Sequence, residues 1–183
     1  MKTIITLTLI ALTTALSAQT KYFTRNGTVT FFSSAPMEDI TAENYNAIAV
    51  VDTESGAMEF SVLMKSFNFK KALMQEHFNE NYVESDEFPK STFKAKILNL
   101  DEIDFTKDGS YPAKTEGEMT IHGVTHTIAP DGTIVVKDGK VNLESKFIVK
   151  PEDYDIEIPD VVREKIAKEI EVTVMADLEP LKR

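Results

Sequence analysis

Apolar and polar residues alternate in short runs along most of the chain after residue 20. The longest such run lies near the carboxyl end, where Ile170, Val172, Val174, Ala176 and Leu178 alternate with mainly polar residues. Successive side chains of a strand point to opposite faces of a sheet, so this run predicts a strand with one buried face. The same pattern predicts further strands over 22–33, 91–100, 114–122 and 124–129.

A β-hairpin is predicted over residues 133–149. Its turn is Asp138-Gly139, because this pair accepts the positive φ angles that a two-residue hairpin turn requires. Closing the turn places Val136 opposite Val141 and Ile134 opposite Leu143. The face that these residues share continues with Ser145, Phe147 and Val149.

A second hairpin is predicted over residues 47–64, around a turn at 53–56. The expected pairs across it are Val51 with Met58, Ala49 with Phe60, and Ala47 with Val62.

Two segments depart from the strand pattern. Residues 70–82 have helical spacing, and residues 159–168 begin with Pro159 and predict a second short helix. One or two short helices cannot cover both faces of a parallel sheet, so the fold class is all-β with roughly eight or nine antiparallel strands.

An all-β chain must protect its sheet edges, and closing the sheet into a barrel removes them. A barrel of about eight strands is either filled by its side chains or holds one small ligand. Ala47, Ala49, Ser145 and Ala176 are small residues on predicted inward faces, which favours a cavity; a packed sandwich is the alternative. On this reading Ala49→Phe or Ala176→Phe fills the cavity at modest cost in stability.

Residues 1–18 have the layout of a secretory signal peptide. Met1-Lys2 gives a basic start, an apolar stretch follows, and small residues precede a cleavage site after Ser17 or Ala18, with Ala18 preferred. The apolar stretch is shorter than the roughly 20 residues of a membrane-spanning helix, so a retained anchor is the less favoured alternative. We therefore expect an exported protein, periplasmic or secreted, whose domain covers residues 19–183.

The chain has 183 residues, no cysteine and a net charge of −10. Without disulfides, a full hydrophobic core must stabilise the exported domain. The negative charge and the lack of a basic patch exclude nucleic-acid binding and disfavour anionic membrane surfaces. No stable membrane insertion is expected once the signal is removed.

Several motifs together resemble the YceI family of bacterial periplasmic polyisoprenoid-binding proteins. His77-Phe78 within residues 67–80 resembles the family's helix motif, and residues 88–93 resemble its Phe-Pro-x-Ser-Thr-Phe strand entry. Residues 117–125 resemble its Gly-x-Leu-Thr-Ile-His-Gly-Val-Thr turn. Residues 153–156 resemble its Asp-Tyr-Gly-Ile stretch, with Asp155 where Gly is usual.

The resemblance covers most of the chain after residue 60 and implies a fold and a ligand. The fold is an eight-stranded antiparallel lipocalin-like barrel with an internal tunnel. The ligand is an isoprenoid or other long-chain lipid, such as a polyprenyl or quinone tail. Residues 36–45 match the family less well and are interpreted as an insertion or a reshaped loop.

Polar chemistry points to no catalytic, cofactor or metal site. His122 and His126 flank Gly123 in a strand context, where residues four apart are about 13 Å apart along the strand. We interpret His122 as bonding turn backbone and His77 as a packing or capping residue. No nucleophile elbow or EF-hand pattern occurs, although acidic residues over 84–87 leave calcium as a weak alternative.

The apolar residues are the candidate binding site, and burial of a lipid tail needs area, at about 25 cal/mol per Å², rather than fixed polar groups. The predicted lining comprises Phe67, Phe69, Leu73, Met74, Phe78, Phe88, Phe93, Met119, Ile121, Phe147 and Val149. The predicted function is a non-enzymatic carrier of an isoprenoid-like lipid; the alternative is a structural or stress-related barrel with a filled core. A lipid hydrolase lacks a nucleophile motif, and exposed Met37 and Ile40 leave room for a homodimer.

Overall fold

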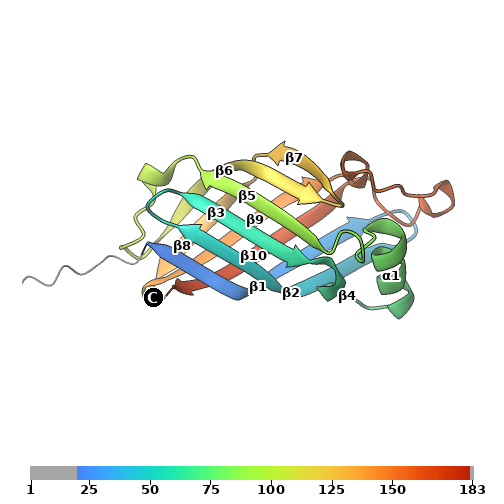
Figure 1. Ribbon diagram of the computed structural model, residues 1–183, viewed down its shortest axis with the longest axis horizontal. Helices are drawn as coiled ribbons and strands as arrows, with labels where there is room; N and C mark the ends of the chain where they lie inside the picture. The colour runs from blue at the N-terminus through green and yellow to red at the C-terminus, as the bar shows by residue number, and fades with distance from the viewer. Residues whose placement is uncertain (1–19, 182–183) are drawn as a thin grey trace, which may run out of the picture.

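Ten strands lie in residues 20–181, the part of the chain that the computed structural model describes. Eight of them form a closed antiparallel barrel in the order β1-β10-β9-β8-β6-β5-β3-β2, and β2 pairs back with β1 (Figure 1). The eight are β1 (Lys21–Ser34), β2 (Asp39–Asp52), β3 (Ala57–Leu63), β5 (Lys90–Ile97), β6 (Gly109–Ile121), β8 (Asp131–Lys137), β9 (Lys140–Val149) and β10 (Ile170–Pro180). Two shorter strands, β4 (Asn68–Phe69) and β7 (Val124–Ile128), pair with β2 and β6.

The barrel confirms the predicted fold class, and the hairpin over 133–149 forms as expected. Val136 pairs with Val141 and Ile134 with Leu143 across the Asp138 turn. Asp138 has φ +51° and the next glycine has φ +74°, which is the backbone that a two-residue hairpin turn requires. The expected signal peptide, residues 1–18, lies outside the described residues.

The interpretation of residues 36–45 as a reshaped loop is wrong from Asp39 onward. Strand β2 begins at Asp39, and its first residues pair with β1, from Asp39 with Ser34 to Asn44 with Val29. Ala42 and Asn44 are fully buried on the inward face of this strand. The alternation was present in the sequence, but polar Asn44 interrupted the apolar pattern there.

The hairpin of β2 and β3 confirms two of its three expected pairs. Val51 pairs with Met58 and Ala49 with Phe60, but the ladder stops at Ile48 and Ser61. Beyond that point the Asn44 side-chain amide donates to the Leu63 carbonyl at 2.9 Å. This buried amide takes the place of the next backbone bonds, so Ala47 and Val62 are not paired.

The helix predicted over 70–82 is present as α1 (Ala72–His77), which continues as a π-helical turn over Phe78–Tyr82. The second predicted helix is largely wrong, because only Asp160–Val162 forms a 3-10 turn. Val161 is 90% exposed there, so its side chain does not face the interior.

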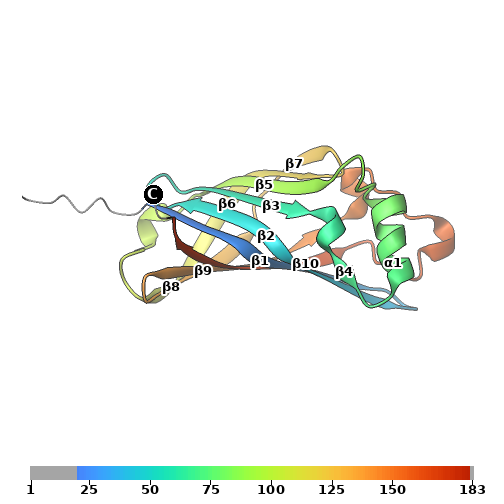
Figure 2. The same ribbon diagram turned by 60° about the horizontal axis from the view of Figure 1, so that its bottom comes forward.

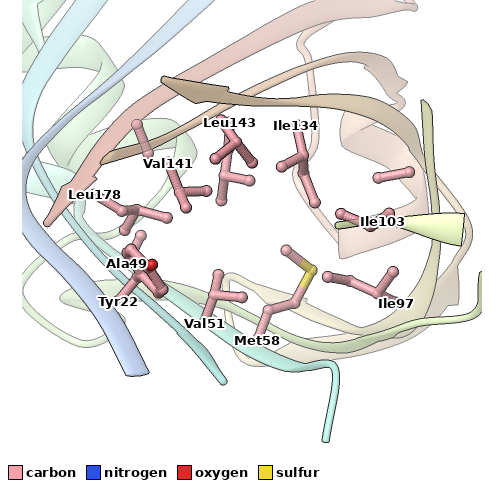
Figure 3. Packing of buried hydrophobic residues seen from close by; sticks show 13 residues of the cluster. Tyr22, Ala49, Val51, Met58, Ile97, Ile103, Ile134, Val141, Leu143 and Leu178 are labelled. Atoms are coloured by element: carbon pink, nitrogen blue, oxygen red, sulfur yellow. The ribbon is translucent and has the colours of Figure 1, made fainter. Parts of the chain in front are cut away.

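One end of the barrel is filled with side chains (Figure 3). Ile97, Ile134 and Leu178 are almost fully buried in this cluster, and Ile103 from the loop between β5 and β6 lies buried with them. The barrel is closed at this end because that loop folds over it and contributes its own apolar residues. The cluster comprises Tyr22, Ala49, Val51, Met58, Ile97, Ile103, Ala113, Ile134, Val136, Val141, Leu143, Ala176 and Leu178.

The expectation that Ala49 and Ala176 border a cavity is wrong. Ala49 and Ala176 are 0% and 1% exposed, and both belong to this packed cluster rather than to a cavity wall. Large neighbours such as Leu178 and Val51 compensate for their small side chains.

Both described termini lie at the filled end, where Tyr22 pairs with Pro180. Helix α1 stands at the opposite end, together with the β1–β2 turn and the loop over 159–169, and two views agree on this arrangement (Figures 1 and 2). The two ends of the barrel therefore differ in what covers them.

Candidate functional site

A cavity of about 510 Å³ occupies the half of the barrel next to α1. It is bordered by inward residues of all eight barrel strands, by α1 and by the chain that follows β9. Its aliphatic and aromatic lining comprises Val29, Phe31, Ile40, Met58, Phe60, Val62, Met64, Phe67, Phe69, Leu73, Met74, Phe78, Val83, Phe93, Ala113, Met119, Ile121, Ile134, Leu143, Phe147, Val149, Ile156, Ile158, Val162, Ile166, Ile170, Val172 and Val174. A space of this size and lining is typical of sites for apolar ligands.

The cavity continues the inward face of strands whose other ends are packed. On β10, Ala176 and Leu178 belong to the filled cluster, whereas Ile170, Val172 and Val174 border the cavity. One strand pattern therefore supplies both a core and a wall of the cavity.

Four phenylalanines form one wall of the cavity near α1. Phe31 of β1 lies 5.4, 5.6 and 5.5 Å from the ring centres of Phe67, Phe69 and Phe78. Phe78 also lies 5.0 Å from Phe69. Aromatic pairs at these separations attract each other beyond their buried area, so the four rings stabilise one another in this wall.

The cavity reaches the outside next to α1, because Leu73 borders it and is 60% exposed. Hydrogen bonds and an ion pair connect the segments around this opening. Met37 donates its backbone N–H to the Glu164 carbonyl at 3.0 Å. Lys71 forms an ion pair with Glu38 beside it.

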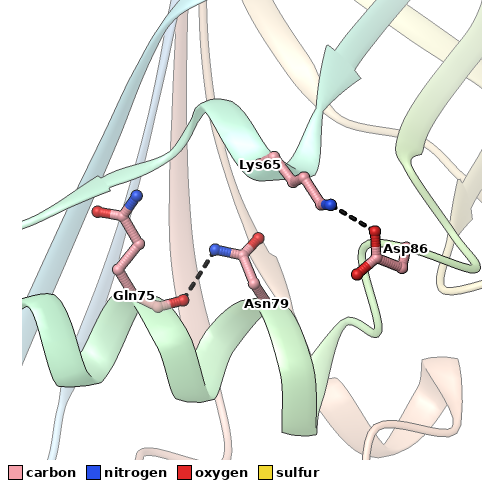
Figure 4. A network of polar contacts seen from close by, with 4 residues as sticks. All are labelled: Lys65, Gln75, Asn79 and Asp86. Atoms are coloured by element: carbon pink, nitrogen blue, oxygen red, sulfur yellow. Dashed lines mark hydrogen bonds and ion pairs between the residues drawn. The ribbon is translucent and has the colours of Figure 1, made fainter.

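Two polar contacts lie in and beside the helical segment (Figure 4). Lys65, in the turn after β3, forms an ion pair with Asp86, and Asn79 donates its side-chain amide to the Gln75 carbonyl at 2.8 Å. The ion pair links the turn after β3 to the loop that follows the helical segment, and the amide bond lies within that segment.

Ten of the eleven predicted lining residues border this cavity. They are Phe67, Phe69, Leu73, Met74, Phe78, Phe93, Met119, Ile121, Phe147 and Val149. Their contact with a ligand stays a prediction.

Phe88 was wrongly placed in the lining. Its ring lies edge-on to His122, with centres 4.5 Å apart, on the loop before β5. A Cβ added to Gly123 would come within 2.6 Å of the Phe88 ring, so this ring packs on the β6–β7 turn instead of on the cavity.

The lining also includes residues that the sequence interpretation did not single out. Phe31 and Val29 follow the inward alternation of the first predicted strand, and Val172 and Val174 follow that of the last. The sequence showed the strand pattern of these residues. It did not show which part of the barrel interior stays empty.

His122 and His126 form hydrogen bonds with loops near the cavity. His122 and Gly123, with φ +50° and +75°, form the two-residue turn between β6 and β7, so His122 lies in the turn and His126 lies on β7. His122 bonds the Tyr154 carbonyl through Nδ1 at 3.1 Å and the Glu84 carboxylate through Nε2 at 2.8 Å. It therefore joins three loops rather than bonding its own turn.

His122→Ala is expected to lower the free energy of unfolding by about 2 kcal/mol, because two partly buried hydrogen bonds are lost. Chemical denaturation of both proteins measures this difference. His122→Asn is the matched control, since Asn also tolerates a left-handed backbone but cannot reach both partners. Its free energy of unfolding should lie between those of the parent and the alanine variant. A loss below about 0.5 kcal/mol for the alanine variant would contradict the assignment.

Two tyrosines near the cavity are shielded from water. Burial raises the pKa of Tyr82, which borders the cavity. Burial, and secondly the charge of Asp153, raises the pKa of Tyr154. Both hydroxyls therefore stay protonated at neutral pH and add no charge to the apolar site.

Asp155, at the position where the resembled motif has glycine, has φ +54°. Glycine adopts this left-handed backbone without steric cost, and Asp is among the residues that tolerate it best. The turn is thus kept despite the substitution.

Among residues 20–181, no three His, Cys, Asp or Glu residues are placed to hold a metal ion together. In the same range, no helix has both the length and the apolar character needed to cross a membrane.

Comparison with known proteins gives a family and a fold. A sequence model of the YceI-like domain matches residues 12–178. No protein with a curated function matches the chain.

Solved structures share the barrel at low sequence identity. A polyisoprenoid-binding domain from Saccharophagus degradans, implicated in plant cell wall breakdown, has a TM-score of 0.75 at 13% identity, over 89% of this chain and 99% of that domain. BcnA of Burkholderia cenocepacia has a TM-score of 0.68 at 13% identity, over 83% and 95% of the two chains. The YceI protein of Campylobacter jejuni has a TM-score of 0.59 at 18% identity, over 78% and 85%. At these identities the likeness concerns the fold alone.

Proposed function

The chain belongs to the family of YceI-like domains, and on that premise we propose that it is an exported, non-catalytic carrier that holds an isoprenoid-like lipid in its cavity. The single observation that carries this proposal is the apolar cavity of about 510 Å³ beside a half of the same barrel whose inward residues form a buried hydrophobic cluster. A barrel filled throughout, the alternative function class, does not fit that cavity.

The ligand class follows from the lining. Phenylalanine, methionine and branched aliphatic side chains border most of the cavity. Of its polar neighbours, Thr115 and Ser145 already donate their hydroxyls to backbone carbonyls. A methyl-branched hydrocarbon chain buries area against such walls and asks for no polar partner, at about 0.8 kcal/mol per methylene-sized group. The Saccharophagus domain, which shares the barrel, is a polyisoprenoid-binding domain.

The location is part of the proposal. The signal-like layout of residues 1–18 supports export to the periplasm or beyond. In that setting, the carrier would transport, store or sequester a lipid whose tail is insoluble in water.

Binding should strengthen with the length of the isoprenoid. In a series of geraniol, farnesol and geranylgeraniol, each added isoprene unit is expected to increase the affinity about tenfold or more until the cavity is full, because each unit buries more apolar area. Displacement of fluorescent all-trans-retinol measures the affinities. Equal affinities along the series, or no binding of any member, would contradict the proposal.

Native mass spectrometry of protein purified from its own host provides an independent test. A bound species of defined lipid mass supports the proposal. Protein that is always free of lipid, together with no retinol binding in vitro, overturns it.

A further inference from the structure

The wall of the barrel has a seam on its cavity half. Strand β6 is divided between two partners: Gly109–Lys114 pairs with β8, and Gly117–Ile121 pairs with β7. The pairing of β8 with β9 ends at Gly132 and Ser145. Within residues 20–181, the outer edge of β7 and residues 146–149 of β9 therefore have no strand partner on the sides that follow each other around the barrel.

Side chains, not a strand, fill this seam. The chain after β9 forms a 3-10 turn over Pro151–Tyr154 and runs on to Ile158; we call residues 151–158 the plug. Tyr154 is only 3% exposed and lies in one buried cluster with residues of both flanking strands. Those neighbours are Val124 and Ile128 of β7 and Phe147 and Val149 of β9.

Two histidines hold the plug in place. His126 of β7 bonds the Asp153 carbonyl through Nε2 at 2.6 Å, and its ring lies edge-on to Tyr154 at 5.2 Å. His122 bonds the Tyr154 carbonyl from the β6–β7 turn. These are side-chain bonds to single carbonyls, whereas each barrel strand is fixed by a continuous ladder, so the plug can leave without breaking the sheet.

The cavity meets the seam on its β9 side, where Phe147 and Val149 border it. Ile156 and Ile158 of the plug also border the cavity. At the base of the seam, Thr133 and Glu144 pair across the outer face of β8 and β9, and both also border the cavity. Glu144 is exposed on that outer face.

We propose that the seam between β7 and β9 is the portal through which the lipid chain enters and leaves, and that Tyr154 is its gate. This inference rests on the proposed carrier function. Through a seam, a long lipid chain can enter sideways and contact Phe147 and Val149 along its length. Through the opening beside α1, the chain would have to thread in from one end. That end opening is also tied by the Met37–Glu164 bond and by the donation of the Ala167 N–H to the Ser33 hydroxyl at 2.9 Å.

Removal of the gate should change rates more than affinity. Tyr154→Ala is expected to raise both the association and the dissociation rate of all-trans-retinol about tenfold or more, with a smaller change in Kd, as measured by stopped-flow fluorescence. Tyr154→Phe keeps the ring and should leave both rates unchanged. If the alanine variant is folded and both of its rates stay within about twofold of the parent, Tyr154 is not the gate.

Locking the plug tests the portal without removing the ring. Because the chain has no cysteine, a short reversible bifunctional thiol reagent will bridge only introduced thiols. His126→Cys with Asp153→Cys bridges plug and β7, and Met37→Cys with Glu164→Cys bridges the end opening as the matched control. The seam bridge should slow retinol uptake about tenfold or more, with recovery after reduction, while the end bridge leaves uptake unchanged.

The outcomes of the bridging experiment are distinct. Slow uptake with the end bridge and normal uptake with the seam bridge overturns the portal but keeps the carrier function. Absence of retinol binding in the parent and in every variant overturns the carrier function and the portal with it.

Discussion

Ala176→Phe is expected to lower the free energy of unfolding by about 3 kcal/mol or more, and to shift Tm down by roughly 6–12 °C. Ala176 is 1% exposed and lies in the filled half of the barrel, where Leu143 is its direct cross-strand neighbour. The added ring has no space there and must displace packed side chains or backbone. Thermal and chemical unfolding, followed by circular dichroism, measure the loss.

Met175→Phe is the matched control for this variant. Met175 is the preceding residue on β10 and is exposed on the outer face, so a ring at this position meets solvent instead of the core. Its stability should stay within about 0.5 kcal/mol of the parent. An Ala176→Phe protein as stable as this control would mean that the filled half holds a void.

Ser145→Phe should have the opposite profile, with retinol affinity reduced about a hundredfold and only a small loss of stability. Ser145 points inward from β9, one inward position beyond Leu143, and borders the cavity. A phenyl ring there occupies space that several carbons of the ligand would otherwise fill, each worth about 0.8 kcal/mol. The lost hydroxyl bond to the Asp131 carbonyl costs about 1 kcal/mol of stability.

Retinol titration and a melting curve on the same sample distinguish these effects. Lys146→Phe places the ring on the outer face of the same strand and should bind retinol as the parent does. Unchanged retinol affinity of a folded Ser145→Phe protein would show that the ligand does not use this part of the cavity.

The contrast between Ala176 and Ser145 shows what the sequence could and could not predict about the barrel interior. Both were recognised as small inward residues, because alternation fixes the face on which a strand residue lies. The local pattern carried no information on what stands opposite each of them. Ala176 meets Leu178 and its neighbours in the filled cluster, whereas Ser145 faces the cavity.

The aromatic wall and the loop positions show the same limit. Phe67, Phe69 and Phe78 were expected near α1, and they do meet there, but Phe31 reaches them from a strand more than thirty residues away in sequence. Phe88 was expected in the cavity and packs on His122 instead, because the turn at Gly123 leaves room for its ring.

By itself the sequence determined the strand content, the Asp138-Gly139 hairpin, the inward faces and the family, because turn chemistry and period-two alternation are local properties. Tertiary structure decided which half of the barrel is filled. The loop that carries Ile103 folds over one end, and α1 covers the other without filling it. It also decided that Tyr154, rather than a strand, closes the seam beside β7, since that depends on where the strand ladders end.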